Sequence, residues 1–220
     1  MEFKRITLLS GHYGSGKTNI AVNLALMLKN ESNRVAIADI DIVNPYFRTR
    51  DSKGELEDAG VKVICSEFAG SNVDLPALPQ DVYALTDDKG LTAIIDVGGD
   101  DRGALALGRW RDKIVEENNY EMLLVINMYR PLTSDVKSTI EVMREIELAA
   151  GMKFTAVVNN SNLGDDTDEQ TVLDSLDYAK GVCEAAGLPL KMTTVPDWLV
   201  GSLKNRIPNL LGLKLQEKIR

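Results

Sequence analysis

The sequence predicts an α/β fold in which a doubly wound, mainly parallel sheet of about seven strands has helices on both faces. Short apolar runs rich in β-branched residues alternate with segments of helical periodicity, which is typical of βαβ units. Most of these runs are apolar throughout, as expected for strands that are buried on both faces. The chain has 220 residues, of which 44% are hydrophobic. We therefore expect a single domain over residues 1–220.

Seven runs are expected to form the strands of this sheet. They are Ile6–Leu9, Val35–Asp39, Val61–Cys65, Ala93–Val97, Met122–Ile126, Thr155–Val158 and Met192–Val195. Helices are expected directly after the first strand and at four further places: about Ser134–Ala150, about Glu169–Ala186, Asp51–Gly60 and Pro76–Asp88. Gly151 and Gly187 mark two of the helix ends, and Asp168 is a candidate N-cap.

One glycine-rich stretch follows the first strand and precedes a segment with helical spacing. Residues Gly11–Thr18 read G-H-Y-G-S-G-K-T, which matches the P-loop pattern G-x-x-x-x-G-K-[ST] in its required context. Glycines let such a loop curl until backbone N–H groups converge on phosphate oxygens at the positive end of a helix dipole. Lys17 would reach the β- and γ-phosphates, and the hydroxyl of Thr18 would ligate Mg²⁺. The predicted nucleotide-binding residues of this stretch are Tyr13, Gly14, Ser15, Gly16, Lys17, Thr18 and Asn19.

Acidic residues stand where the second and fourth predicted strands end. Asp39 and Asp41 follow one apolar run, and Asp96 closes another before Gly98 and Gly99. Because buried carboxylates are costly without a cation, we expect Asp39 and Asp96 to serve a Mg²⁺ site beside the P-loop. Gly98 or Gly99 can offer a backbone N–H to the γ-phosphate. A solvated acidic loop and a plain glycine turn are the alternatives for these two segments.

The sixth and seventh predicted strands end in residues that can flank a base. The sixth ends in Val158-Asn159-Asn160-Ser161-Asn162, and the seventh ends in Val195-Pro196-Asp197. An asparagine side chain can pair with the edge of a base through its donor and its acceptor. Either segment alone is a weak signal, because Asn-rich turns are common in loops.

Taken in order, these segments resemble the MinD/ParA/nitrogenase-iron-protein group of P-loop ATPases over most of the chain. The resemblance implies ATP, Mg²⁺ and a homodimer that forms face to face across two nucleotides. It implies that Asp41 positions the hydrolytic water, that Asp96 is the Walker-B residue, and that Asn159 contacts adenine. Pro196 and Asp197 would close over the base. The guanine-reading patterns N-K-x-D and T-K-x-D do not occur, so ATP is favoured over GTP.

One position departs from this family. Where the family has a lysine that crosses the dimer interface to the partner's phosphates, this chain has His12, its single histidine. His12 is either a weaker or pH-sensitive replacement of that lysine, or only a loop residue. An arginine can supply the missing cation, and the candidates are Arg48, Arg50, Arg102 and Arg109.

Composition and charge argue against several classes of partner. The formal net charge of −8 disfavours a DNA-binding role, which needs a basic face. Cys65 and Cys183 form no C-x-x-C pattern, so no iron–sulfur cluster is expected. No signal peptide or membrane-spanning run is found, and a cytoplasmic protein is expected. The basic, Leu-rich segment Leu203–Arg220 is expected to be a final helix packed on the sheet, with membrane attachment as the alternative.

These observations predict a Mg²⁺-dependent ATPase that acts as a nucleotide switch on an unknown protein partner. The loops after Asp41 and Asp96 would be the switch segments, because γ-phosphate contacts order such loops and hydrolysis releases them. Lys17, Asp41 and His12 are the candidate catalytic residues. One alternative is an ATP-dependent small-molecule ligase or kinase of the dethiobiotin-synthetase type. Another is a regulator that binds nucleotide without turnover.

Overall fold

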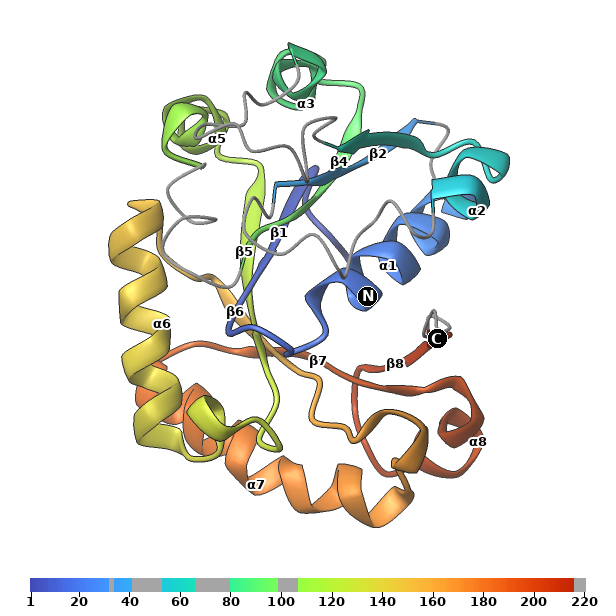
Figure 1. Cartoon of the computed structure of the whole chain (residues 1–220), viewed down its shortest axis with the longest axis vertical. Coiled ribbons are helices and arrows are strands. Elements are labelled where there is room, and N and C mark those ends of the chain that lie inside the picture. The colour runs from blue at the N-terminus through green and yellow to red at the C-terminus, as the bar shows by residue number, and fades with distance from the viewer. Residues whose placement is uncertain (32–33, 41–52, 66–79, 99–106, 216–220) are drawn as a thin grey trace, which may run out of the picture.

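The computed structural model describes residues 1–31, 34–40, 53–65, 80–98 and 107–215. Its strands form one sheet in the order β3-β2-β4-β1-β5-β6-β7-β8 (Figure 1), and the neighbouring strands run parallel. The strands are β1 (Ile6–Ser10), β2 (Val35–Asp39), β3 (Lys62–Cys65), β4 (Thr92–Asp96), β5 (Tyr120–Ile126), β6 (Ala156–Asn159), β7 (Leu190–Pro196) and β8 (Leu210–Leu213). The predicted α/β fold class is confirmed.

The longer helices lie where the apolar spacing places them. The helices are α1 (Lys17–Glu31), α2 (Lys53–Asp58), α3 (Ala84–Asp87), α5 (Arg111–Glu117), α6 (Val136–Ala150), α7 (Glu169–Ala186) and α8 (Val200–Leu203). Asp168 caps α7 by accepting a hydrogen bond from the Thr171 N–H at 2.7 Å. Gly151 and Gly187 end α6 and α7 in the left-handed conformation that favours glycine.

The two shorter helices expected from the sequence are shorter still in the structure. The stretch expected from Asp51 to Gly60 contains α2, and the stretch expected from Pro76 to Asp88 contains a 3₁₀ turn (Gln80–Tyr83) followed by α3. Residues 51–52 and 76–79 lie outside the described residues. The helix α5 was not anticipated from the sequence, because its seven residues show too little periodicity to be recognised.

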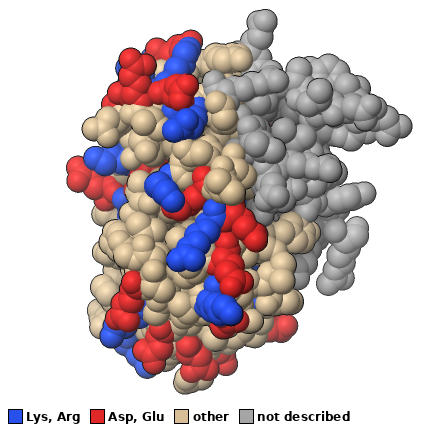
Figure 2. Space-filling view, turned by 90° about the vertical axis from the view of Figure 1, so that its left-hand side faces the viewer, with Lys and Arg blue, Asp and Glu red and all other residues tan. Residues whose placement is uncertain are grey.

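Helices cover both faces of the sheet. Apolar side chains of α1 and α2 pack on one face, and those of α3, α5, α6 and α7 pack on the other. Figure 1 shows α1 and α2 to the right of the strands and α5 and α6 to the left. Trp110, which precedes α5, is only 2% exposed in the core between the sheet and the helices α3, α5, α6 and α7. The outer surface on the side of α5 and α6 carries interspersed positive and negative side chains (Figure 2).

The C-terminal segment differs from the expected final helix. In place of that helix, α8 ends at Leu203, and Leu210–Leu213 forms an eighth strand that pairs with β7 from Thr193 to Pro196. Pro208 cannot donate the hydrogen bond that a helix needs at its position, and Asn209 adopts a left-handed conformation with φ of 51°. A Cβ atom on Gly212 would lie 2.6 Å from Cγ2 of Val200, so this strand passes close to α8. Residues 216–220 lie outside the described residues.

None of the described helices combines the length and the apolar character needed to cross a lipid bilayer.

The strand order places the loop after β1 at the centre of one sheet edge. β1 lies between β4 and β5, and the chain passes from β1 to β2 on one side before it returns to β5 on the other. In open α/β sheets, ligands bind at the carboxyl ends of the strands where the winding reverses. The loop of residues 11–16 leaves β1 at this point and leads directly into α1.

Candidate nucleotide-binding site

The loop between β1 and α1 has a conformation that depends on its glycines. Gly11, Gly14 and Gly16 have φ values of 149°, 76° and 89°, a region that other residues rarely adopt. A Cβ atom on Gly11 would lie 2.3 Å from the carbonyl oxygen of Val125, and one on Gly16 would lie 2.2 Å from Nδ2 of Asn160. Side chains at these two positions would collide with the structure that supports the loop.

Lys17 begins α1 and folds back across the loop. Its Nζ atom donates to the carbonyl oxygens of Gly11 at 3.0 Å and His12 at 3.3 Å, and the residue is only 7% exposed. The hydroxyl of Ser15 is buried and has no hydrogen-bond partner among the described residues. The curled backbone, the buried ammonium group and this hydroxyl lie at the N-terminus of a 15-residue helix, where backbone N–H groups favour anions. These residues fit a polyphosphate.

Two acidic residues end the neighbouring strands β2 and β4, and the hydroxyl of Thr18 reaches one of them. Asp39 and Asp96 are register partners in the two neighbouring strands, and both are buried. The hydroxyl of Thr18 donates to Oδ2 of Asp96 at 2.5 Å. No group of three or more His, Cys, Asp or Glu residues that could hold a metal is found among the described residues. The arrangement fits Mg²⁺, which uses one or two carboxylates and takes other ligands from phosphates and water.

Several of the predicted residues lie outside the described part of the chain. These are Asp41, Gly99, Arg48, Arg50 and Arg102, and the side chain of Arg109 is likewise outside it. The roles assigned to them stay predictions. Gly98 is described and is buried directly after β4.

His12 and Tyr13 form the outer part of the loop. The His12 ring is partly exposed, and its Nδ1 lies 2.9 Å from the carbonyl oxygen of Tyr13. The backbone carbonyl of His12 accepts from the N–H of Ser15 as well as from Lys17. The Tyr13 side chain is 58% exposed. The catalytic role of His12 stays a prediction.

The two asparagines at the end of β6 have different surroundings. The Asn159 side chain is fully buried; its Nδ2 donates to Oγ of Ser175 at 2.9 Å, and its Oδ1 accepts from the N–H of Ser161. Asn160 instead contacts the P-loop, where its Nδ2 donates to the carbonyl oxygen of Ser15 at 2.6 Å. The contact of Asn159 with a base stays a prediction.

Asn160 also joins the P-loop to β7. Its Oδ1 accepts from the hydroxyl of Thr194 at 2.5 Å. Beyond Thr194, β7 ends at Pro196, which is buried, and Asp197 follows it in an exposed position. Trp198 is 52% exposed at the same place. The β7 end is therefore linked to the P-loop through one asparagine, while the contacts of Pro196 and Asp197 with a base stay predictions.

Arg130 also lies beside the P-loop, although it was not singled out from the sequence. It lies in the loop after β5, and its side chain lies beside Gly14: an ideal Cβ on that glycine would be 3.4 Å from Nε of Arg130. The one signal that could have found Arg130 is its position, four residues beyond the end of β5. This strand lies next to β1 in the sheet.

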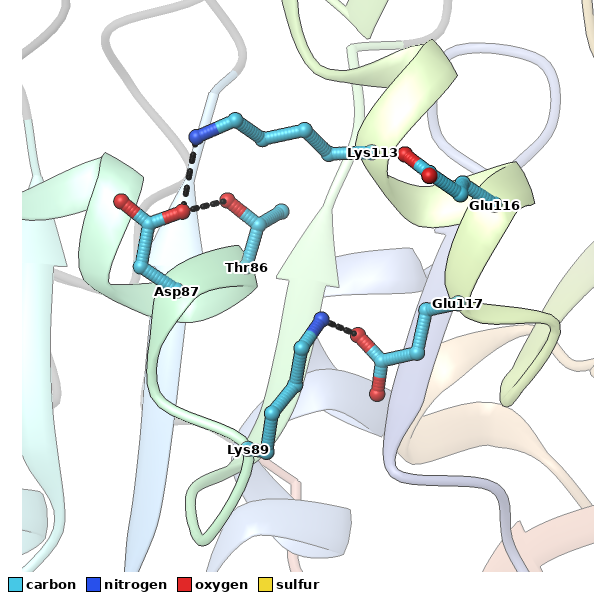
Figure 3. A pocket seen from close by; sticks show the side chains of 6 residues that line it. All are labelled: Thr86, Asp87, Lys89, Lys113, Glu116 and Glu117. Carbon is cyan, nitrogen blue, oxygen red and sulfur yellow. Dashed lines mark hydrogen bonds and ion pairs between the residues drawn. The ribbon is translucent and has the colours of Figure 1, made fainter.

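A separate charged hollow of about 480 Å³ lies between α3 and α5 (Figure 3). Lys113 points from α5 to Asp87 at 2.7 Å, and Lys89 contacts Glu117 at 2.6 Å. The hydrogen bond from Lys113 lowers the pKa of Asp87. The hydrogen bonds from Arg5, which precedes β1, lower the pKa of Glu117 despite partial burial. This hollow is at the start of β1, whereas the P-loop is at its end.

One family model matches the segment that contains the loop. A family model of the ParA group, described as an NUBPL iron-transfer P-loop NTPase, matches residues 3–50. This stretch is less than a quarter of the chain, and it includes β1, the P-loop, α1 and β2. No curated protein was found to match the sequence.

Two of the solved structures with a similar architecture are FtsY proteins. FtsY from Mycoplasma mycoides matches with a TM-score of 0.55 and 19% identity over 88% of this chain and 63% of its own. The cell division protein FtsY from Thermotoga maritima matches with a TM-score of 0.54 and 18% identity, over 86% of this chain and 61% of its own. The chain has the P-loop NTPase fold.

A third solved structure of similar fold is that of the signal recognition particle 54 kDa protein from Aeropyrum pernix K1 in complex with GDP. Its TM-score is 0.52 and its identity is 16%, over 87% of this chain and 41% of its own. This chain spans about 60% of the length of the FtsY proteins that it matches. Likeness at these identities establishes the fold and does not decide the nucleotide base.

Proposed function

We propose that this protein is a Mg²⁺-dependent ATPase whose nucleotide state switches its interaction with a protein partner. The observation that carries the proposal is the geometry of the P-loop. Its backbone curls at three glycines with positive φ, Lys17 lies across it, and the Thr18 hydroxyl bonds to Asp96 at the end of β4. We infer the same single domain, over residues 1–220, that the sequence predicts.

Each part of the loop has a distinct task in this proposal. The N–H groups at the start of α1 bind phosphate oxygens, and Lys17 exchanges its bonds to the carbonyls of Gly11 and His12 for phosphate oxygens. Thr18, Asp39 and Asp96 hold Mg²⁺, directly or through water, and the ion neutralises charge on the phosphates. Asp41 positions the attacking water.

Three parts of the proposal depend on the resemblance to the MinD/ParA/nitrogenase-iron-protein group. They are the choice of ATP, the homodimer and the loops that bind the partner. The match of the ParA-group model to residues 3–50 supports this placement. In the proposal, the segments after Asp41 and after Asp96 change when the γ-phosphate is lost, and a protein partner is gripped or released. A homodimer forms across two bound nucleotides.

Two substitutions test the assignment of roles. Binding of ATP and GTP, with and without Mg²⁺, is measured by calorimetry, and phosphate release is measured separately. Lys17→Ala is expected to abolish binding, whereas Asp41→Ala should retain binding and slow turnover. Lys204→Ala is the matched control, because Lys204 is exposed beyond α8. Wild-type protein that binds no triphosphate, or binding that survives Lys17→Ala unchanged, would contradict the proposal.

A further inference from the structure

The loop after β5 presents one arginine to the P-loop. The Arg130 side chain lies against Gly14, with Nε, Cζ and Cδ at 3.4, 3.6 and 3.7 Å from the position of an ideal Cβ on that glycine. Any side chain at position 14 would therefore meet this guanidinium group. β5 and β1 are neighbouring parallel strands, so the loops at their carboxyl ends lie side by side.

The backbone around Arg130 is held firmly. Its N–H donates to the carbonyl oxygen of Asn127 at 3.2 Å, and its own carbonyl accepts from the N–H of Thr133 at 3.0 Å. The buried side chain of Asn127 accepts from the N–H of Tyr129, and the Thr133 hydroxyl donates to the Asn127 carbonyl. Pro131 restricts the preceding residue to an extended conformation, which Arg130 adopts at φ −107° and ψ 135°.

In contrast to its backbone, the Arg130 side chain is not held by hydrogen bonds or ion pairs to the described residues. The residue is exposed, and its guanidinium group forms no hydrogen bond or ion pair with the described residues. By comparison, Arg5 binds Glu117 and three backbone carbonyls. A guanidinium group on a fixed backbone, with its donors available, suits bidentate binding of a phosphate.

The place of Arg130 along the loop indicates which phosphate it would meet. The Lys17 ammonium group, which in P-loops contacts the β- and γ-phosphates, lies against the carbonyls of Gly11 and His12. The first half of the loop is thus the side of the terminal phosphates. Gly14 lies two residues beyond His12 in the loop, and the Arg130 side chain lies beside it.

We propose that Arg130 binds the terminal phosphate of the nucleoside triphosphate held in the P-loop of its own chain. This inference rests on the proposed function, because it requires a triphosphate at the P-loop. The family that this chain resembles has a lysine in this loop, at the position of His12. In this proposal Arg130, from the same chain, supplies a cation to the loop instead. A second chain is not required to supply that charge.

The test compares the affinities of a non-hydrolysable triphosphate and of a diphosphate for wild type and three variants. Arg130→Ala is expected to weaken triphosphate binding about tenfold, as loss of a charged hydrogen bond implies, and to affect diphosphate binding much less. Arg130→Lys should lie between wild type and alanine, because lysine keeps the charge without the bidentate geometry. Arg144→Ala, at an exposed position of α6, should match wild type. Thermal unfolding of each variant verifies that the protein is folded.

Two results would overturn this inference while the proposed function stands. One is Arg130→Ala binding both nucleotides as tightly as Arg144→Ala does. The other is an equal loss for diphosphate and triphosphate, which would assign Arg130 a role in supporting the loop rather than in binding the terminal phosphate. Failure of the wild type to bind any triphosphate would instead remove the proposed function, and this inference with it.

Discussion

Replacing Asn160 with alanine removes the side chain that joins the P-loop to the sheet. The substitution leaves the Ser15 carbonyl without its 2.6 Å bond from Nδ2, and it leaves the Thr194 hydroxyl with only a 3.4 Å contact to the Asn159 carbonyl. Asn160 is buried, so water does not readily replace these bonds. Each buried polar group left unsatisfied costs about 1–3 kcal/mol. We therefore expect Asn160→Ala to lower the free energy of unfolding by about 2–4 kcal/mol.

Urea unfolding followed by circular dichroism measures this loss. A decrease of this size corresponds to a shift of the midpoint by about 1 M or more. Asn205→Ala is the matched control, because Asn205 is exposed beyond α8, and it should change the midpoint little. Nucleotide affinity should fall with Asn160→Ala more than with Asn159→Ala, since only Asn160 contacts the P-loop. A midpoint for Asn160→Ala equal to that of the control would refute this account of the loop.

The remaining predictions concern one glycine of the loop and one ion pair. Gly16→Ala should abolish nucleotide binding, measured by calorimetry, because its Cβ would lie 2.2 Å from Nδ2 of Asn160. Gly164→Ala is the matched control: Gly164 also has a positive φ, but a Cβ there would meet no atom within 4 Å. Calorimetry should find the nucleotide affinity of Gly164→Ala unchanged. Glu117→Gln should reduce stability at neutral pH by about 1–3 kcal/mol, because Arg5 loses its charged partner. The pKa of Glu117 is lowered in the folded protein, so its contribution is fully present above about pH 4.5 and is lost as the pH falls through the lowered pKa. Chemical unfolding at a series of pH values should show this loss of stability in wild type and not in Glu117→Gln. Plots of unfolding free energy against pH that run parallel for the two proteins would contradict the prediction.

The fold class and the P-loop could be predicted because local sequence determines them. Apolar runs such as Val35–Asp39 are buried at every position in the structure, and the glycines of residues 11–16 are required by local backbone angles and close packing. The eighth strand could not be predicted in the same way. Leu210–Leu213 is short, and its pairing with β7 is a tertiary contact that the helical spacing of its leucines conceals.

The side-chain partners of the site were harder to predict. Successive residues at a strand end point to opposite faces, so the choice between Asn159 and Asn160 depends on register, which the sequence does not display. Arg130 is brought to Gly14 because β5 lies beside β1, although 116 positions separate the two residues in the chain. Strand order, rather than any motif, assembles this part of the site.

The two tryptophans have contrasting environments, and this contrast makes intrinsic fluorescence selective. Trp110 is 2% exposed in the core, whereas Trp198 is 52% exposed at the end of β7. Emission from the first should shift to longer wavelength only when the core opens, while a soluble quencher should reach the second in the native protein. Replacing either ring with phenylalanine would give two optical reporters within one protein, one for global unfolding and one for events at the edge of the sheet that carries the P-loop.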